Sequence, residues 1–128
     1  EIEVKAKIDT GAYSTSIDTE LAKKLGFGEM LQLFDVAFHQ FTPQIKRGEG
    51  DRITKEFMEI HGKNIEQLES VTSVFSASGA TLRPIANMSF VMDNETVSSR
   101  VNITDRADLQ YSVLIGRRDL KKFLIQVS

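Results

Sequence analysis

The first residues of the chain alternate between charged and apolar side chains. Ile2, Val4 and Ala6 are separated by glutamate and lysine residues, and this period of two is typical of a strand with one buried face. The alternation stops near Asp9, which is followed by a hydroxyl residue and two small residues. We therefore expect a half-buried strand that carries Asp9 to the surface at its end.

Three amphipathic helices are predicted in the first half of the chain. Asp18 or Thr19 can cap the first helix, and Gly26 stands where its end is expected. Apolar residues recur at intervals of three and four over residues 29–41, and Asp51 can cap a third helix after a glycine-containing loop. The apolar positions expected to face the core are Leu21, Leu25, Met30, Leu33, Phe34, Ala37, Phe38, Phe41, Ile53, Phe57 and Ile60.

Strands return after Ser70. Residues 71–75 and 81–92 are predicted to be two strands joined by small residues, a composition that suits a hairpin tip able to open and close. A turn at residues 93–95 then leads to a strand over residues 96–104. The tip residues are Ser76, Ala77, Ser78, Gly79 and Ala80. The inward positions are Ala86, Met88, Phe90, Met92, Val97, Val101 and Ile103.

Composition excludes several classes of protein. The 128 residues suit one domain of ordinary globular composition, with 41% apolar and 27% charged residues. The absence of cysteine excludes disulfides and thiolate sites, and His39 and His61 form no metal-binding motif, so we expect no metal and no cofactor. The net charge of -2 argues against nucleic-acid binding.

Location and chain limits follow from the same reading. No apolar stretch approaches the roughly 20 residues of a membrane span, and no secretory signal is present, so we expect a cytoplasmic protein without membrane contact. Because Glu1 already falls within the first strand, we expect this domain to be excised from a longer chain.

Residues 9–12 read Asp-Thr-Gly-Ala and are the main candidate for chemistry. Glycine tolerates tight-turn geometry and small neighbours let a substrate approach a carboxylate closely. Taken alone, the motif is equally compatible with an ordinary turn. A second segment, residues 111–120, runs as an apolar strand through Gly116 into a short helix, and residues 124–127 are expected to form a last strand.

Together these two segments resemble the retropepsins, aspartic proteases in which a later hydrophobic-hydrophobic-Gly strand crosses behind an Asp-Thr-Gly turn. The resemblance narrows to bacterial and archaeal proteins related to, and sometimes fused with, the ATP-grasp glutamate ligases that modify ribosomal protein; some relatives carry a zinc-protease label. The matching segments are Lys7–Ala12, Arg83-Pro84, Thr104–Arg106 and Leu114–Arg118.

The resemblance implies a mainly β fold with inserted helices, a closed β-barrel of the acid protease type, in a single domain over residues 1–128. The helical region around residues 29–66 is longer than anything that the viral retropepsins place there. It could cover a sheet edge, extend a dimer interface or cap the substrate cleft, and the sequence leaves these three roles open.

The activity that the resemblance implies is aspartic endopeptidase activity. Hydrolysis by carboxylates needs two of them, about 3 Å apart and sharing one proton, so that one activates water and the other polarises the peptide carbonyl. The chain has a single Asp-Thr-Gly motif, so a homodimer must supply the second Asp9 across a two-fold axis. Asp105, Asp108 and Asp119 are weaker candidates because none follows a strand on a small-residue turn.

Site roles are also carried over from the resemblance. Asp9, Thr10 and Gly11 are the expected catalytic residues, with the Thr10 hydroxyl tying the two active-site turns together. Ser14 is expected close enough to hydrogen-bond the Asp9 carboxylate, and the Ser76–Ala80 hairpin is the expected flap over the peptide. The expected substrate-binding residues are Ala12, Ser14, Ser76, Ala77, Ser78, Gly79, Ala80 and Arg83.

The substrate and the function have alternatives. Arg83, Arg106, Arg117 and Arg118 could bind carboxylates of glutamate-rich or glutamylated peptides, or they could form surface or interfacial ion pairs. We favour a homodimeric aspartic peptidase. The alternative is a catalytically silent dimerisation or peptide-binding module attached to a ligase domain, and a metal-dependent hydrolase is poorly supported by two distant histidines.

Overall fold

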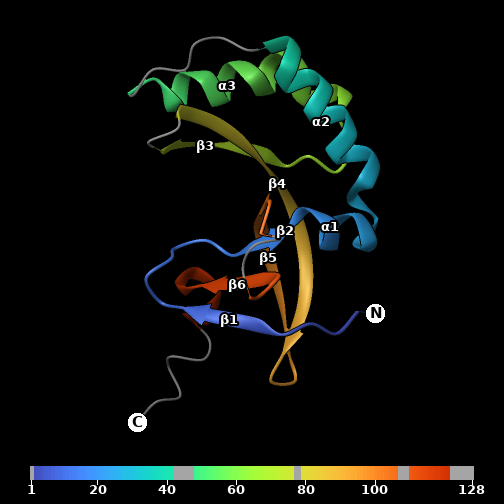
Figure 1. Ribbon diagram of the computed structural model, residues 1–128, viewed down its shortest axis with the longest axis vertical. Helices are drawn as coiled ribbons and strands as arrows, with labels where there is room; N and C mark the ends of the chain where they lie inside the picture. The colour runs from blue at the N-terminus through green and yellow to red at the C-terminus, as the bar shows by residue number, and fades with distance from the viewer. Residues whose placement is uncertain (1, 42–47, 77–78, 107–109, 122–128) are drawn as a thin grey trace.

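The computed structural model describes residues 2–41, 48–76, 79–106 and 110–121 (Figure 1). The predicted final strand over residues 124–127 and the tip residues Ala77 and Ser78 lie outside these ranges, as does Asp108. Within the described ranges, none of the helices has the length and hydropathy needed to cross a membrane.

Six strands form one sheet. They are β1 (Ala6–Asp9), β2 (Ser16–Asp18), β3 (Ser70–Ser76), β4 (Gly79–Met92), β5 (Glu95–Thr104) and β6 (Val113–Gly116). Their order is β1-β6-β2-β5-β4-β3, with parallel pairing of β1 with β6 and of β2 with β5. The predicted mainly β fold with inserted helices is confirmed. No hydrogen-bonded pairing joins β1 to β3 in the described residues, so hydrogen bonds do not close these strands into a barrel.

The long hairpin of β4 and β5 runs through the length of the molecule (Figure 1). Its two-residue turn is formed by Asp93 and Asn94, with φ of 52° and 63°, and Met92 pairs with Glu95. A left-handed conformation at both central residues matches the twist of the flanking strands, and Asp and Asn tolerate it well. The predicted inward positions Val97, Val101 and Ile103 are buried.

The helical elements are α1 (Thr19–Ala22), η1 (Lys23–Phe27), α2 (Gly28–Phe41), α3 (Gly50–His61), η2 (Gly62–Asn64) and η3 (Arg117–Leu120). Asp18 caps α1, because its Oδ2 accepts a hydrogen bond from the Glu20 N–H at 3.1 Å. Gly26 adopts a φ of 101°, which bends the chain and separates α1 from α2.

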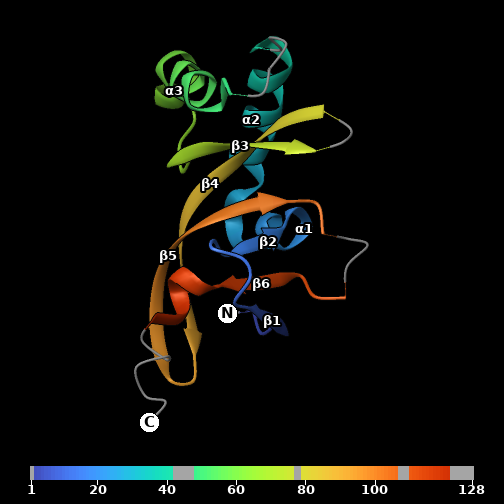
Figure 2. The same ribbon diagram turned by 90° about the vertical axis from the view of Figure 1, so that its left-hand side faces the viewer.

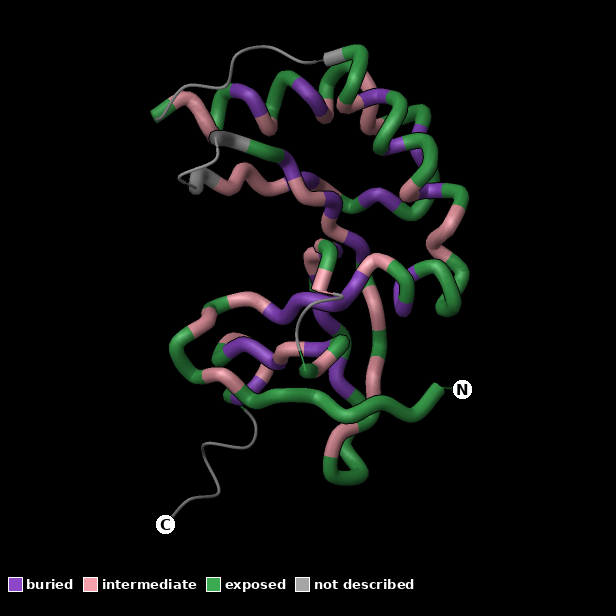
Figure 3. Tube along the Cα trace, viewed as in Figure 1, coloured by how far each residue is buried: buried purple, intermediate pink, exposed green. Residues whose placement is uncertain are grey.

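The helices α2 and α3 form a layer over β3 and β4 (Figures 1 and 2). The rings of Phe34 in α2 and Phe57 in α3 are both buried, with their centroids 5.5 Å apart. Val71 of β3 and Leu82 of β4 belong to the same core cluster, and buried positions gather where the helices face these strands (Figure 3). The helical region therefore covers this part of the sheet.

Several predicted core positions are exposed. Leu25 and Ile60 have exposed fractions of 44% and 53%, because Leu25 precedes the bend at Gly26 and Ile60 lies in the last turn of α3. Ile2 and Val4 have exposed fractions of 44% and 46%, because they precede β1, an edge strand with a neighbour on one side only. The prediction of a half-buried first strand is therefore wrong for the single chain.

Two details of the helical region also differ from the prediction. Leu33 is exposed, because the inward face of α2 is narrower than the periodicity suggests. Asp51 is not the cap of α3: Glu49 precedes the helix, and its side chain makes no capping hydrogen bond. The Glu49 carboxylate forms an ion pair with Arg52 instead.

Candidate active site

Asp9 is the last residue of β1 and lies opposite Gly116 of the parallel strand β6. Its Oδ1 accepts a hydrogen bond from the Gly11 N–H at 2.9 Å, and its carbonyl accepts one from the Ala12 N–H at 3.2 Å. These two bonds close the turn and orient the half-buried carboxylate. No donor in the described part of the chain binds the other carboxylate oxygen, Oδ2, which is left available for a water molecule or a second carboxyl group.

The strand β6 crosses behind this turn, as predicted. The Arg117 N–H donates to the Ala12 carbonyl at 2.8 Å, and the Arg118 N–H donates to the Tyr13 carbonyl at 3.1 Å. At Gly116 the backbone of the turn comes so close that a Cβ atom would meet the carbonyl oxygen of Ser14 at 2.5 Å. The absence of a side chain at Gly116 therefore allows β6 to support the Asp9 turn.

A buried polar network lies beneath the turn. Thr15 is 1% exposed, its Oγ1 donates to Asp119 Oδ2 at 2.5 Å, and the same oxygen accepts the Gly116 N–H at 3.1 Å. Ser99 of β5 donates its hydroxyl hydrogen to Asp119 Oδ2 at 2.6 Å. The network joins the chain after the Asp9 turn, the central hairpin and η3, so these three segments hold one another in place.

Thr15→Val is expected to lower the free energy of unfolding by about 1–3 kcal/mol. Valine keeps the shape of threonine, but it leaves the buried Gly116 N–H without an acceptor and removes one donor from Asp119. Urea unfolding of the variant and the wild type, analysed at equal m, measures this difference.

The matched control is Thr54→Val in α3. The Thr54 hydroxyl donates to the Asp51 carbonyl at 3.0 Å at an exposed position, so its loss is expected to cost less than about 0.5 kcal/mol. Equal losses in the free energy of unfolding for the two variants would show that the buried network beneath the turn stabilises the protein no more than an exposed hydrogen bond does.

The role expected of Thr10 stays a prediction because it needs a second chain, whereas Ser14 differs from the expectation. The Thr10 side chain is exposed on the single chain. Ser14 is half-buried, but no hydrogen bond joins it to the Asp9 carboxylate among the described residues. Its main contact with the site is through its backbone, which packs against Gly116.

The predicted flap hairpin is present in outline. β3 and β4 pair as far as Ser76 and Gly79, and Ala77 and Ser78 lie outside the described residues. Arg83 lies farther along β4, opposite Thr72 of β3. A hairpin is present as predicted, but Ser76, Gly79 and Ala80, which were expected in its tip, belong to the paired strands, and its role as a flap stays a prediction.

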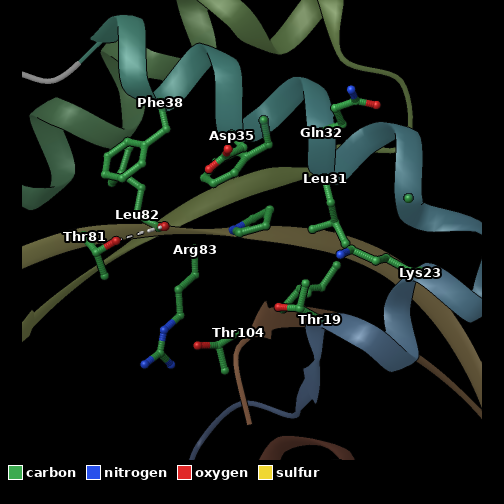
Figure 4. Close-up of a pocket in the computed structure, with 14 residues that line it drawn as sticks. Thr19, Lys23, Leu31, Gln32, Asp35, Phe38, Thr81, Leu82, Arg83 and Thr104 are labelled. Carbon is green, nitrogen blue, oxygen red and sulfur yellow. Dashed lines mark hydrogen bonds between the residues drawn. The ribbon is translucent and has the colours of Figure 1, made fainter. Parts of the chain in front are cut away.

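A groove of about 740 Å³ runs between α2 and β4 (Figure 4). Leu31 and Phe38 of α2 form part of its apolar wall, and Lys23 lies at the end near α1. Arg83 points away from α2, towards Thr104 at the end of β5 (Figure 4). The helical region thus lines a groove along the strand that leads to the predicted flap.

Two of the four arginines singled out in the sequence lie against Tyr13, just after the Asp9 turn, whereas Arg106 contacts the chain before β6. Arg117 and Arg118 place their guanidinium carbons 5.2 Å and 5.6 Å from the centroid of the Tyr13 ring. Arg106 donates through Nε to the Tyr111 carbonyl at 3.3 Å. None of them forms an ion pair with a carboxylate of the described residues.

Sequence reasoning missed the network at Asp119. The sequence pattern assigned no functional role to Thr15, and Asp119 was considered only as an in-chain partner for Asp9. In the structure, Asp119 instead accepts hydrogen bonds from the hydroxyl groups of Thr15 and Ser99. Among the described residues, no group of three histidine, aspartate or glutamate side chains could hold a metal ion.

Comparison with known proteins identifies the family of the chain. No curated protein matches the chain. The solution structure of the simian foamy virus protease is 14% identical, covering 98% of this chain and 87% of that chain at a TM-score of 0.49. A protein of unknown function from Legionella pneumophila is 16% identical, covering 96% and 77% at a TM-score of 0.44. A model of the RimB-like family, described as the retropepsin-like aspartic endopeptidase RimB, matches residues 1–128, and the chain therefore belongs to this family of aspartic endopeptidases.

Proposed function

We propose that two copies of the chain form the working peptidase, with the attacking water held between their Asp9 carboxylates. The observation that carries this proposal is the Asp9 turn, in which Oδ1 is fixed by the Gly11 N–H at 2.9 Å while Oδ2 has no donor among the described residues. The ionised Asp9 takes a proton from water as the water oxygen attacks the peptide carbonyl carbon. The protonated Asp9 of the other chain gives its proton to the carbonyl oxygen, so that a tetrahedral diol forms. The proton taken from water then passes to the peptide nitrogen, one diol hydroxyl returns a proton to the second Asp9, and the C–N bond breaks to release the amine and the carboxylic acid.

The in-chain alternatives for the second carboxylate are weaker than a second Asp9. Asp119 Oδ2 already accepts hydrogen bonds from Thr15 and Ser99. Asp18 is buried, and its two oxygens accept the N–H groups of Glu20 and Arg106. A symmetric dimer needs neither of these occupied carboxylates, because its two-fold axis can bring two identical Asp9 turns together.

Glutamate-rich or glutamylated peptides are the proposed substrates. The exposed Arg117 lies against Tyr13, directly after the Asp9 turn, and guanidinium groups bind carboxylates bidentately. The resemblance to proteins linked with glutamate ligases supports the same substrate class. Dimerisation, the flap and a cytoplasmic location stay predictions.

A mixing experiment tests the shared site. Wild type and Asp9→Asn chains are unfolded together and refolded at a constant total concentration, so that subunits combine at random. If each active site needs both Asp9 residues, an equal mixture is expected to retain about a quarter of the wild-type activity, because only that fraction of dimers is wild type throughout.

A fall to about half, in proportion to the wild-type fraction, would contradict the shared site and assign catalysis to single chains. Gel filtration of the same mixtures establishes whether dimers are present. A crystal structure of the dimer would test the same point through the distance between the two Asp9 carboxylates, which should lie within hydrogen-bond reach of one water molecule.

A further inference from the structure

Arg117 is fixed beside the catalytic turn at both its backbone and its side chain. It follows Gly116, the residue that pairs with Asp9, and its N–H donates to the Ala12 carbonyl at 2.8 Å. Its guanidinium carbon lies 5.2 Å from the centroid of the Tyr13 ring, within the range of a cation-π interaction. The charge of Arg117 is therefore held close to the residues that follow Asp9.

The neighbouring arginine has a different set of contacts. Arg118 donates through Nη2 to the Arg100 carbonyl at 2.5 Å and to the Ser99 hydroxyl at 3.5 Å. These bonds anchor Arg118 to β5. The described part of the chain provides neither a carboxylate partner nor a hydrogen-bond acceptor for the Arg117 guanidinium. Both Arg117 and Tyr13 are exposed, so the guanidinium is open to a ligand.

We infer that Arg117, stacked on Tyr13, forms a subsite that binds a carboxylate of the substrate next to the bond to be cleaved. A guanidinium group presents paired N–H donors that match the two oxygens of a carboxylate. Because the Tyr13 ring restricts the guanidinium before the ligand arrives, less conformational entropy is lost on binding. This inference rests on the proposed function, since it names the residue that selects an acidic peptide.

The carboxylate could belong to a glutamate side chain or to the C-terminus of the peptide. Four versions of one peptide separate these sources. The residue next to the scissile bond is glutamate or glutamine, and each of these two peptides has either a free or an amidated C-terminus. Binding is measured by calorimetry on the Asp9→Asn protein, which does not consume the peptide, and kcat/KM is measured on the protein with Asp9 intact.

Arg117→Gln is expected to weaken binding of the acidic peptide, and to lower its kcat/KM, by about 10- to 100-fold. The matching neutral peptide should change less than about twofold, because it makes no charged contact to lose. Arg117→Lys should recover part of the difference, since lysine keeps the charge without the paired donors.

Two further arginine variants serve as controls. Arg118→Gln removes the anchor to the Arg100 carbonyl, so it should affect acidic and neutral peptides equally. Arg52→Gln removes an exposed arginine that is already paired with Glu49 and Glu56 on α3, and it should leave both peptides unaffected.

Three results with the Arg117→Gln variant would overturn the inference: an equal loss on acidic and neutral peptides, no loss on either, or dissociation of the dimer. The last result would place Arg117 at a subunit contact. If the wild type cleaves both peptides through Asp9 without preferring the acidic one, the carboxylate subsite fails while the peptidase stands. If the wild type cleaves neither, the proposed function fails, and the binding measurements on Asp9→Asn still decide the role of Arg117.

Discussion

Asp9→Asn is expected to lower kcat/KM for peptide hydrolysis by at least about a thousandfold. An asparagine amide neither takes a proton from water nor shares one with a second carboxyl group, so it removes both halves of the acid-base chemistry. The fold should survive, because the amide oxygen of asparagine can accept the Gly11 N–H that Asp9 Oδ1 accepts at 2.9 Å. Steady-state kinetics and urea unfolding on the same preparation separate the two effects.

Asp93→Asn is the matched control for this substitution. It removes the same charge from an exposed position in the β4–β5 turn, where φ is 52° and asparagine is well tolerated. Full activity is expected. Hydrolysis retained by Asp9→Asn would instead assign catalysis to another group. A wild type that binds peptides but cleaves none would favour the silent binding module.

The Asp9 turn and its supporting strand could be predicted because their determinants are local in the sequence. Asp9 and Gly11 lie within one motif, and the strand that ends at Gly116 is a short apolar run before a glycine. Only their meeting in space, with Asp9 opposite Gly116, needed a resemblance to known folds. The β4–β5 hairpin could be predicted for the same reason, because its turn residues are adjacent in the sequence and its strand side chains alternate between apolar and polar.

The buried network could not be predicted in this way. Thr15 and Asp119 are separated by 104 positions, and Ser99 reaches Asp119 from a third segment. Hydroxyl residues have no periodicity that indicates burial, and their usual partners are the backbone or water. Only the packing of all three segments shows that Asp119 accepts hydrogen bonds within the fold, which makes it a poor second carboxylate for Asp9.

The exposure of apolar side chains at the edges of the fold could not be predicted from the hydrophobic pattern either. Periodicity shows that Ile2 and Val4 share a face of an extended segment, but not whether another layer covers it. β1 has a single neighbour, β6, so those side chains remain open to solvent in one chain. For Leu25, the bend at Gly26 changes the direction of the helix, which a regular helical period does not anticipate.

Gly116→Ala is expected to destabilise the protein by about 3 kcal/mol or more, a large part of the stability of an ordinary domain. The added Cβ would lie 2.5 Å from the Ser14 carbonyl carbon and oxygen and 2.6 Å from the Tyr13 carbonyl oxygen. All three atoms belong to the backbone, so no side-chain rotation relieves the contact. Either β6 moves away from the catalytic turn, or the turn moves and displaces Asp9.

Gly28→Ala provides the comparison for this substitution. Gly28 begins α2, and an added Cβ would meet nothing closer than Lys23 Cγ at 4.0 Å. Alanine is the better helix former by about 1 kcal/mol, so this variant should be as stable as the wild type or slightly more stable. Thermal unfolding of both variants measures the contrast. A Gly116→Ala protein as stable as Gly28→Ala would mean that the close approach of β6 does not hold the Asp9 turn in place.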